Sequence, residues 1–169
     1  MAYYNPDPSL GLYNPLAAWP SLPDISLNQK KVEPTETLHP LGRNIKAQPC
    51  KFQDEPRVDI RTWDKDGKRT KKGISLKVSC WRELLHMQQQ LQSDITRLKQ
   101  HAIVCETYHL GEGVYATIKS PLWLVDIRSW YLSEDNTLKP CRKGIALKFD
   151  EFSKLMECSA QIEQWLDTN

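Results

Sequence analysis

Apolar and polar residues alternate along residues 57–63, which is the pattern of a β-strand with one buried face. One face carries Val58 and Ile60, and the other carries Asp59, Arg61 and Trp63. The Asp-Gly pair at residues 66–67 suits a hairpin turn, and residues 73–77 are predicted to form the return strand. From Val78 onward the apolar period becomes helical. We expect one helix that packs along another through a near-heptad stripe of Trp81, Leu84, Leu91, Ile95 and Leu98.

The second half of the chain repeats this order of elements. Residues 114–119 and 122–131 are predicted to be strands, and one face of the longer strand carries Trp123, Val125 and Ile127. Its other face carries Asp126, Arg128 and Trp130. After a turn at residues 133–136, residues 143–148 return, and the last helix is expected to bury Phe152, Leu155, Met156, Ser159, Ile162 and Leu166. Each half is therefore predicted to be an α+β unit, an antiparallel sheet followed by one helix that covers one face and leaves the other open.

The two halves also share sequence. Val-Asp-Ile-Arg-Thr-Trp at residues 58–63 returns as Val-Asp-Ile-Arg-Ser-Trp at residues 125–130. Lys-Lys-Gly-Ile at residues 71–74 likewise returns as Arg-Lys-Gly-Ile at residues 142–145. Two matches in the same order indicate an internal duplication. Because a lone unit of this size would be marginally stable, we expect each copy to complete the core of the other.

The duplication predicts three segments: an arm of residues 1–38, a first repeat of residues 39–100 and a second repeat of residues 107–169. Seven of the 11 prolines fall within the first 40 residues, a density that opposes both helices and strands. The arm also carries scattered aromatic residues, namely Tyr3, Tyr4, Tyr13 and Trp19. Two interpretations of the arm stay open, docking onto a protein partner and simple disorder.

Charge and composition narrow the function classes. The net charge is +2, and the arm holds four acidic residues and two lysines, so the repeats carry about +4, concentrated in residues 65–72 and 139–148. The five cysteines lack C-x-x-C spacing and the histidines lack ligand spacing, so we expect free thiols in a reducing compartment and no metal site. No signal peptide, membrane span, phosphate-binding loop or catalytic triad is evident. The prediction is a soluble intracellular protein that is not an enzyme and uses no cofactor.

The open sheet faces carry the candidate binding chemistry. Each face places an arginine next to a tryptophan, a pair that can hold a phosphate and stack on an unpaired base. The neighbouring turns add cations for the phosphate backbone. The candidate nucleic-acid-binding residues are Arg61, Trp63, Lys68, Lys71, Lys72, Arg128, Trp130, Tyr131, Lys139, Arg142 and Lys143. The opposite interpretation is that the tryptophans pack inside the fold, and that Asp59 and Asp126 pair with the arginines as salt bridges that maintain it.

These segments resemble the positive-cofactor-four transcriptional coactivators, which bind single-stranded DNA. In the second repeat the resemblance rests on Asp-Ile-Arg-Ser-Trp-Tyr at residues 126–131, Lys-Pro-Cys-Arg-Lys-Gly-Ile-Ala-Leu at residues 139–147, and Phe152. In the first repeat it rests on Asp-Ile-Arg-Thr-Trp at residues 59–63, Lys-Lys-Gly-Ile-Ser-Leu at residues 71–76, and Trp81. It covers both repeats and leaves out the arm.

The resemblance implies a curved four-stranded sheet in each repeat, pairing through the helices, and single strands that cross the concave sheet face. Two repeats in one chain then form an intramolecular pseudo-dimer, and a homodimer of such chains stays open. It also implies a nuclear protein that binds single-stranded DNA, or RNA, in transcription or replication. The alternative is an assembly protein that keeps the fold as a dimerisation scaffold and docks through its arm. The acidic pair Asp54-Glu55 and the unusual order Trp130-Tyr131 favour that alternative.

Overall fold

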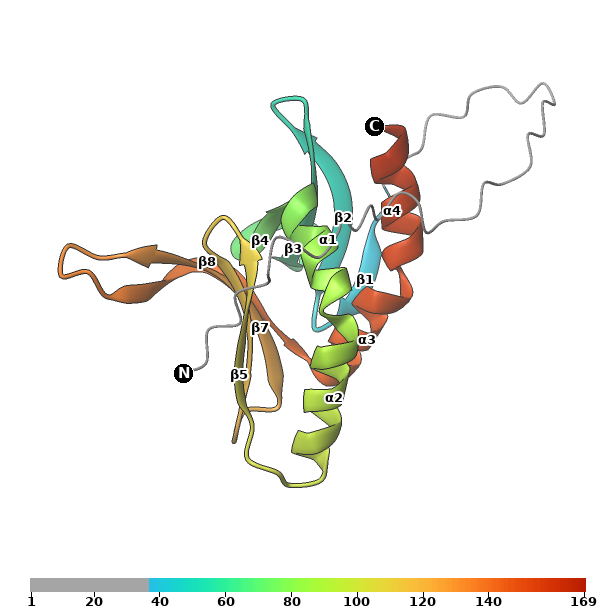
Figure 1. The fold of residues 1–169 in the computed structure, drawn as a ribbon. Helices are drawn as coiled ribbons and strands as arrows, with labels where there is room; N and C mark the ends of the chain where they lie inside the picture. Colours follow the sequence, from blue (N-terminus) through green and yellow to red (C-terminus); the bar gives the residue numbers. More distant parts are fainter. Residues whose placement is uncertain (1–36) are drawn as a thin grey trace, which may run out of the picture. The chain divides into compact units, whose positions relative to one another are not determined.

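The computed structural model describes residues 37–169, so nearly all of the predicted arm lies outside the described residues. The first repeat supplies β1 (His39–Gly42), β2 (Ile45–Phe52), β3 (Glu55–Trp63), β4 (Arg69–Lys77), α1 (Val78–His86) and α2 (Gln88–Lys99). The second repeat supplies β5 (Cys105–Gly111), β6 (Val114–Lys119), β7 (Leu124–Leu132), β8 (Leu138–Lys148), α3 (Phe149–Glu157) and α4 (Ser159–Thr168) (Figure 1). None of the helices in this described part is long and apolar enough to cross a membrane.

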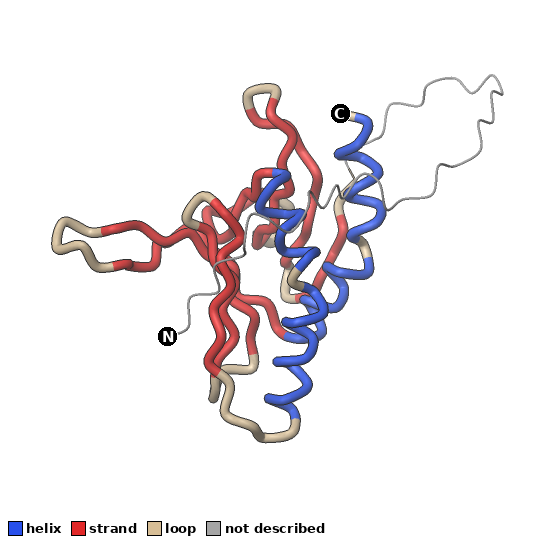
Figure 2. Tube along the Cα trace, viewed as in Figure 1, coloured by secondary structure: helices blue, strands red, loops and turns tan. Residues whose placement is uncertain are grey.

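Each repeat builds one antiparallel sheet in which consecutive strands are neighbours, in the orders β1-β2-β3-β4 and β5-β6-β7-β8. Four strands and then helices follow one another in both repeats (Figure 2), so the predicted α+β class and the tandem antiparallel sheets are confirmed. The strand alternation explains the register. Ile60 in β3 and Ile127 in β7 are fully buried. Each of them pairs with an alanine and an isoleucine of the flanking strands, namely Ala47 and Ile74, and Ala116 and Ile145.

The helices of each repeat pack on the sheet of the other repeat as well as on their own. Helix α1 contacts β5 besides β3 and β4, α2 contacts β6, α3 contacts β1, and α4 contacts β2 and β3. The result is one shared core, whose largest fully buried side chains are Trp81 and Phe152. The near-heptad stripe is buried as expected. The helices that carry it contact β5 and β6 of the opposite sheet, and Arg82 of α1 also forms ion pairs with Glu163 and Asp167 of α4, a helix of the other repeat.

Each predicted helix is interrupted once, at Met87 in the first repeat and at Cys158 in the second. Both residues keep φ in the helical range but have ψ close to 0°, which turns the next helix away from the first. At the second break, the thiol of Cys158 and the hydroxyl of Ser159 donate to the carbonyls of Leu155 and Met156, at 3.2 and 2.6 Å. Such side-chain bonds compete with the helical ladder and bend it.

The turn between β1 and β2 joins the first repeat to the second through a buried carboxylate. The Nε and Nη2 atoms of Arg43 donate to the two carboxylate oxygens of Glu151 in α3, at 2.6 and 2.7 Å. Glu151 also accepts the backbone N–H of Lys148 at 2.7 Å, and its side chain is 1% exposed. The Arg43 hydrogen bonds hold the pKa of Glu151 below its usual range although burial opposes this.

The corresponding turn of the second repeat, between β5 and β6, reverses the charges. Here the carboxylate of Glu112 in the turn forms an ion pair at 2.8 Å with the Nζ atom of Lys77, the residue just before α1. The place of Glu151 is taken by Cys80, whose thiol is buried and donates to the Gly111 carbonyl at 3.5 Å. The two repeats are therefore joined by a cationic turn on one side and an anionic turn on the other.

Candidate nucleic-acid interface

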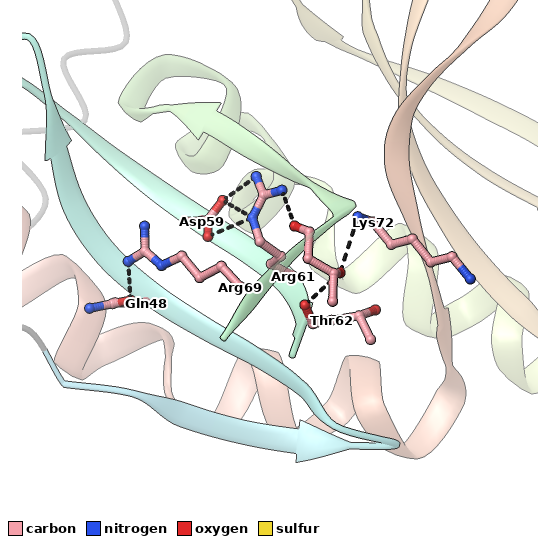
Figure 3. Close-up of polar contacts among 7 residues, drawn as sticks. Gln48, Asp59, Arg61, Thr62, Arg69 and Lys72 are labelled. Carbon is pink, nitrogen blue, oxygen red and sulfur yellow. Dashed lines mark hydrogen bonds and ion pairs between the residues drawn. The ribbon is translucent and has the colours of Figure 1, made fainter. Parts of the chain in front are cut away.

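The arginine of the first duplicated strand is held by its own aspartate. The Nε and Nη2 atoms of Arg61 donate to the Asp59 carboxylate at 2.9 to 3.2 Å, and Nη1 donates to the Thr70 carbonyl at 2.8 Å (Figure 3). Gly73 lies opposite Arg61 on β4. A Cβ there would come within 2.5 Å of the Ile60 carbonyl oxygen and 2.9 Å of the Arg61 Cβ, so only glycine lets β4 lie this close to β3 beside the arginine.

The second repeat builds the same arrangement. Arg128 donates to both carboxylate oxygens of Asp126 at 2.9 and 3.0 Å and to the Cys141 carbonyl at 2.9 Å. Gly144 lies opposite Arg128 on β8, and a Cβ there would come within 2.8 to 3.0 Å of the arginine side chain. In both repeats the carboxylate hydrogen bonds are the main reason that the arginine pKa is raised.

This arrangement, the Arg–Asp latch, explains why Asp-Ile-Arg and Lys-Gly-Ile occur together in each repeat. The motif fixes β3 to β4 and β7 to β8 through the arginine. The structure therefore places Arg61 and Arg128 in the salt bridges that the sequence left as an alternative. Each guanidinium still has about a quarter or less of its side chain exposed, so its charge is largely offset by the neighbouring aspartate.

Trp63 lies half-buried beyond the latch, between two cations. The Lys46 Nζ is 4.8 Å from the Trp63 ring centroid, and the Arg69 guanidinium carbon is 5.7 Å from it. Arg69 also donates to the Gln48 side-chain oxygen at 2.5 Å (Figure 3). Within residues 37–169 neither Lys46 nor Arg69 forms an ion pair with a carboxylate. Their charge is thus available to a phosphate.

Trp130 lies among aromatic rings instead. The Tyr115 ring meets the Trp130 ring edge-on at 6.2 Å between centroids, and the His109 ring stacks on Tyr115 at 4.7 Å. These three rings come from the adjacent strands β5, β6 and β7. His109 is exposed, and Tyr115 and Trp130 are partly exposed. A row of rings on an open sheet is a surface on which unpaired bases can stack.

The remaining predicted residues are exposed cations and one exposed ring. They are Lys68, Lys71 and Lys72 around β4, then Lys139, Arg142 and Lys143 on β8, and Tyr131 on β7. Strands β4 and β8 lie next to each other, so the two cation groups are carried by neighbouring strands. Lys139 is 3.8 Å from the Asp135 carboxylate, an exposed pair that offsets little of its charge.

The candidate residues taken from the sequence omitted Lys46, Arg69 and Tyr115, which border the two tryptophans, and His109, which stacks on Tyr115. The signal was present in the alternation of β2, where Lys46 follows buried Ile45, and of β6, where Tyr115 follows buried Val114. No group of side chains among residues 37–169 has the arrangement of a metal site.

Comparison with known protein families places the chain. Residues 39–87 and 122–158, together half of its length, match the family described as Transcriptional Coactivator p15 (PC4). Neither the curated proteins nor the solved structures gave a match. The matched segments contain both Arg–Asp latches, both tryptophans and the first helix of each repeat. By this match and by its two copies of four strands and a helix, the chain belongs to the family of the transcriptional coactivator p15 (PC4).

Proposed function

We propose that this protein binds single-stranded DNA across the open faces of its two sheets and acts in transcription, in the nucleus, without catalysis. The observation that carries the proposal is the setting of the two tryptophans. Trp63 lies between two cations without carboxylate partners, and Trp130 lies beside two further rings. Rings and free cations on an open sheet suit unpaired bases and a phosphate backbone. Family membership supports the transcriptional role.

Fluorescence anisotropy with a labelled strand of about 20 nucleotides tests the proposal. We expect single-stranded DNA to bind more tightly than the duplex of the same sequence. Each phosphate contact should add about −0.7 to the slope of log affinity against log salt concentration. An RNA strand of the same sequence, used as competitor, reports whether the sugar matters. Equal affinity for duplex and single strand, or no binding at low salt, would refute the proposal.

Substitution of the two tryptophans tests the site. Trp130→Ala should lose about 1–3 kcal/mol of binding free energy if a base stacks on its ring, and Trp63→Ala should also weaken binding because it removes the ring against which Lys46 and Arg69 lie. Trp123→Ala is the matched control. Its ring is 49% exposed and packs against Phe149 at 5.9 Å, next to the core side of β7. We expect Trp123→Ala to bind like the wild type. A loss as large as that of the other two would locate binding elsewhere.

The Arg–Asp latches favour one other function, an assembly protein that uses the fold as a scaffold, because they engage two predicted binding residues in holding strands together. In both functions residues 1–38 are proposed to contact a protein partner. Nucleic-acid binding measured before and after deletion of residues 1–38 separates the two. A scaffold loses its partner in a pull-down and binds no nucleic acid before or after the deletion. A DNA-binding protein keeps its affinity for the single strand.

A further inference from the structure

Corresponding positions on the two open faces carry different chemistry. The residue opposite the latch arginine on the preceding strand is Lys46 in the first sheet and Tyr115 in the second. The residue opposite the tryptophan on the following strand is Arg69 in the first sheet and Pro140 in the second. Both positions next to the tryptophan therefore hold a cation in the first repeat and an uncharged side chain in the second.

These exchanges change what each tryptophan can do. In the first repeat the two cations approach the Trp63 ring at 4.8 and 5.7 Å, where they limit access of a base to the ring and attract anions. In the second repeat the rings of His109, Tyr115 and Trp130 continue one another across three strands. They offer a longer stacking surface without added charge.

From this difference we infer that the two repeats divide the binding of one single strand. The face around Trp63 holds backbone phosphates through Lys46 and Arg69, and the face around Trp130 stacks bases through Tyr115 and the adjacent rings. This inference rests on the proposed function. The inference goes beyond the proposed function, because a symmetric pair of repeats would make equivalent contacts on both faces. In this chain the first repeat binds phosphates and the second repeat binds bases.

The two kinds of contact differ in their response to salt. Phosphate contacts release counterions, so each contributes to the salt slope, whereas stacking contributes affinity at every salt concentration. The double variant Lys46→Gln with Arg69→Gln should therefore reduce the slope by about 1.4, which is about 0.7 for each lost contact. Tyr115→Leu, a change that keeps an apolar side chain on the strand, should lower affinity about five- to hundredfold and leave the slope unchanged.

An abasic DNA strand of the same length supplies a second readout, since it has phosphates but no bases. Wild-type protein should bind it more weakly than the normal strand, and Tyr115→Leu should lower that affinity no further. The lysine and arginine variant should weaken it and reduce its salt slope as before. Urea unfolding of each variant establishes that the fold is retained.

The outcomes separate this inference from the proposed function. If wild-type protein binds no single strand, both fail. If it binds, but the two variants reduce the salt slope equally or Tyr115→Leu weakens binding of the abasic strand as well, the division between repeats is wrong while single-strand binding stands. Only a slope change confined to Lys46 and Arg69, with base dependence confined to Tyr115, supports the inference.

Discussion

Replacing Arg43 by methionine tests how far the fold depends on the buried carboxylate that joins the repeats. In the wild type, Glu151 accepts two hydrogen bonds from the Arg43 guanidinium and one from the backbone of Lys148. Arg43→Met removes the first two and leaves a carboxylate whose side chain is 1% exposed with a single donor. Methionine keeps an unbranched apolar stem in place of the arginine stem and removes the guanidinium, so the change is mainly one of charge and hydrogen bonding.

The expected cost follows from the exposure of the two partners. Loss of one partner from a fully buried ion pair costs about 3–5 kcal/mol, whereas exposed pairs contribute about 0–1 kcal/mol. The Arg43 side chain is 47% exposed, so solvent screens part of its charge. We therefore expect the free energy of unfolding to fall by about 2 kcal/mol. For a chain of this size that corresponds to a fall in melting temperature of about 4–8 °C.

The effect should depend on pH in one direction. The folded-state pKa of Glu151 is lowered, chiefly by the Arg43 hydrogen bonds. The stability that this group contributes is thus present above the unfolded glutamate pKa of about 4.3 and is lost as pH falls through the lower folded pKa. In the variant, burial without the cation favours the protonated acid. The difference between wild type and variant should shrink as pH falls below about 4.

Urea unfolding followed by tryptophan fluorescence at pH 7 and at pH 3.5 measures both effects. Arg82→Met is the matched control. Arg82 is 48% exposed and also contacts two carboxylates, but these belong to Glu163 and Asp167, which are 24% and 69% exposed. Its loss should cost less than about 1 kcal/mol. Equal costs for the two variants, or a cost for Arg43→Met that grows at low pH, would refute the reasoning.

Two further predictions concern the glycines opposite the latch arginines and the hydrogen bond between Tyr108 and Asp94. Gly73→Ala should lower the free energy of unfolding by more than Gly144→Ala does, as measured by urea unfolding. The Cβ of the first variant would strike a backbone carbonyl, whereas the Cβ of the second variant would strike the movable Arg128 side chain. The reverse order would contradict this reasoning. Tyr108 donates to fully buried Asp94 at 2.5 Å, and burial, followed by this bond, raises its pKa. Tyr108→Phe should therefore lower the free energy of unfolding by about 1–3 kcal/mol. Ultraviolet titration of the wild type should show one tyrosine still protonated above pH 10, and its absence would contradict the contact with Asp94.

The strands and the open faces could be predicted because their signal is local. The alternation around Ile60 and Ile127 fixes which side chains face the core, and the same alternation occurs in both repeats. The crossing of the helices could not be predicted in the same way. A buried stripe on a helix reports that it packs against something, and a sheet and a helix leave the same period in the sequence.

The roles of Arg61 and Arg128 also could not be predicted from the strand alternation. Alternation places each arginine on the open face beside an aspartate, and it cannot tell a guanidinium that reaches solvent from one that folds back. The decisive residues are the glycines that pair with them. Without a Cβ, Gly73 lets β4 lie close to the β3 backbone, and Gly144 leaves the space in which the Arg128 side chain lies. These arrangements exist only once β4 is paired in register with β3 and β8 with β7.

The reversed charges of the two turns determine which repeats can join. Two first repeats in this geometry would bring Arg43 against Lys77 and Cys80, a cation beside a cation with no carboxylate. Two second repeats would bring Glu112 toward buried Glu151, a like-charge contact of the most costly kind. The charges therefore favour the pairing of unlike repeats, and one chain contains one of each. Pairing of two repeats within one chain, as in this structure, does not weaken on dilution, as the pairing of two separate copies would. A chain that pairs its own repeats in this way needs no second copy to bring its two sheets together.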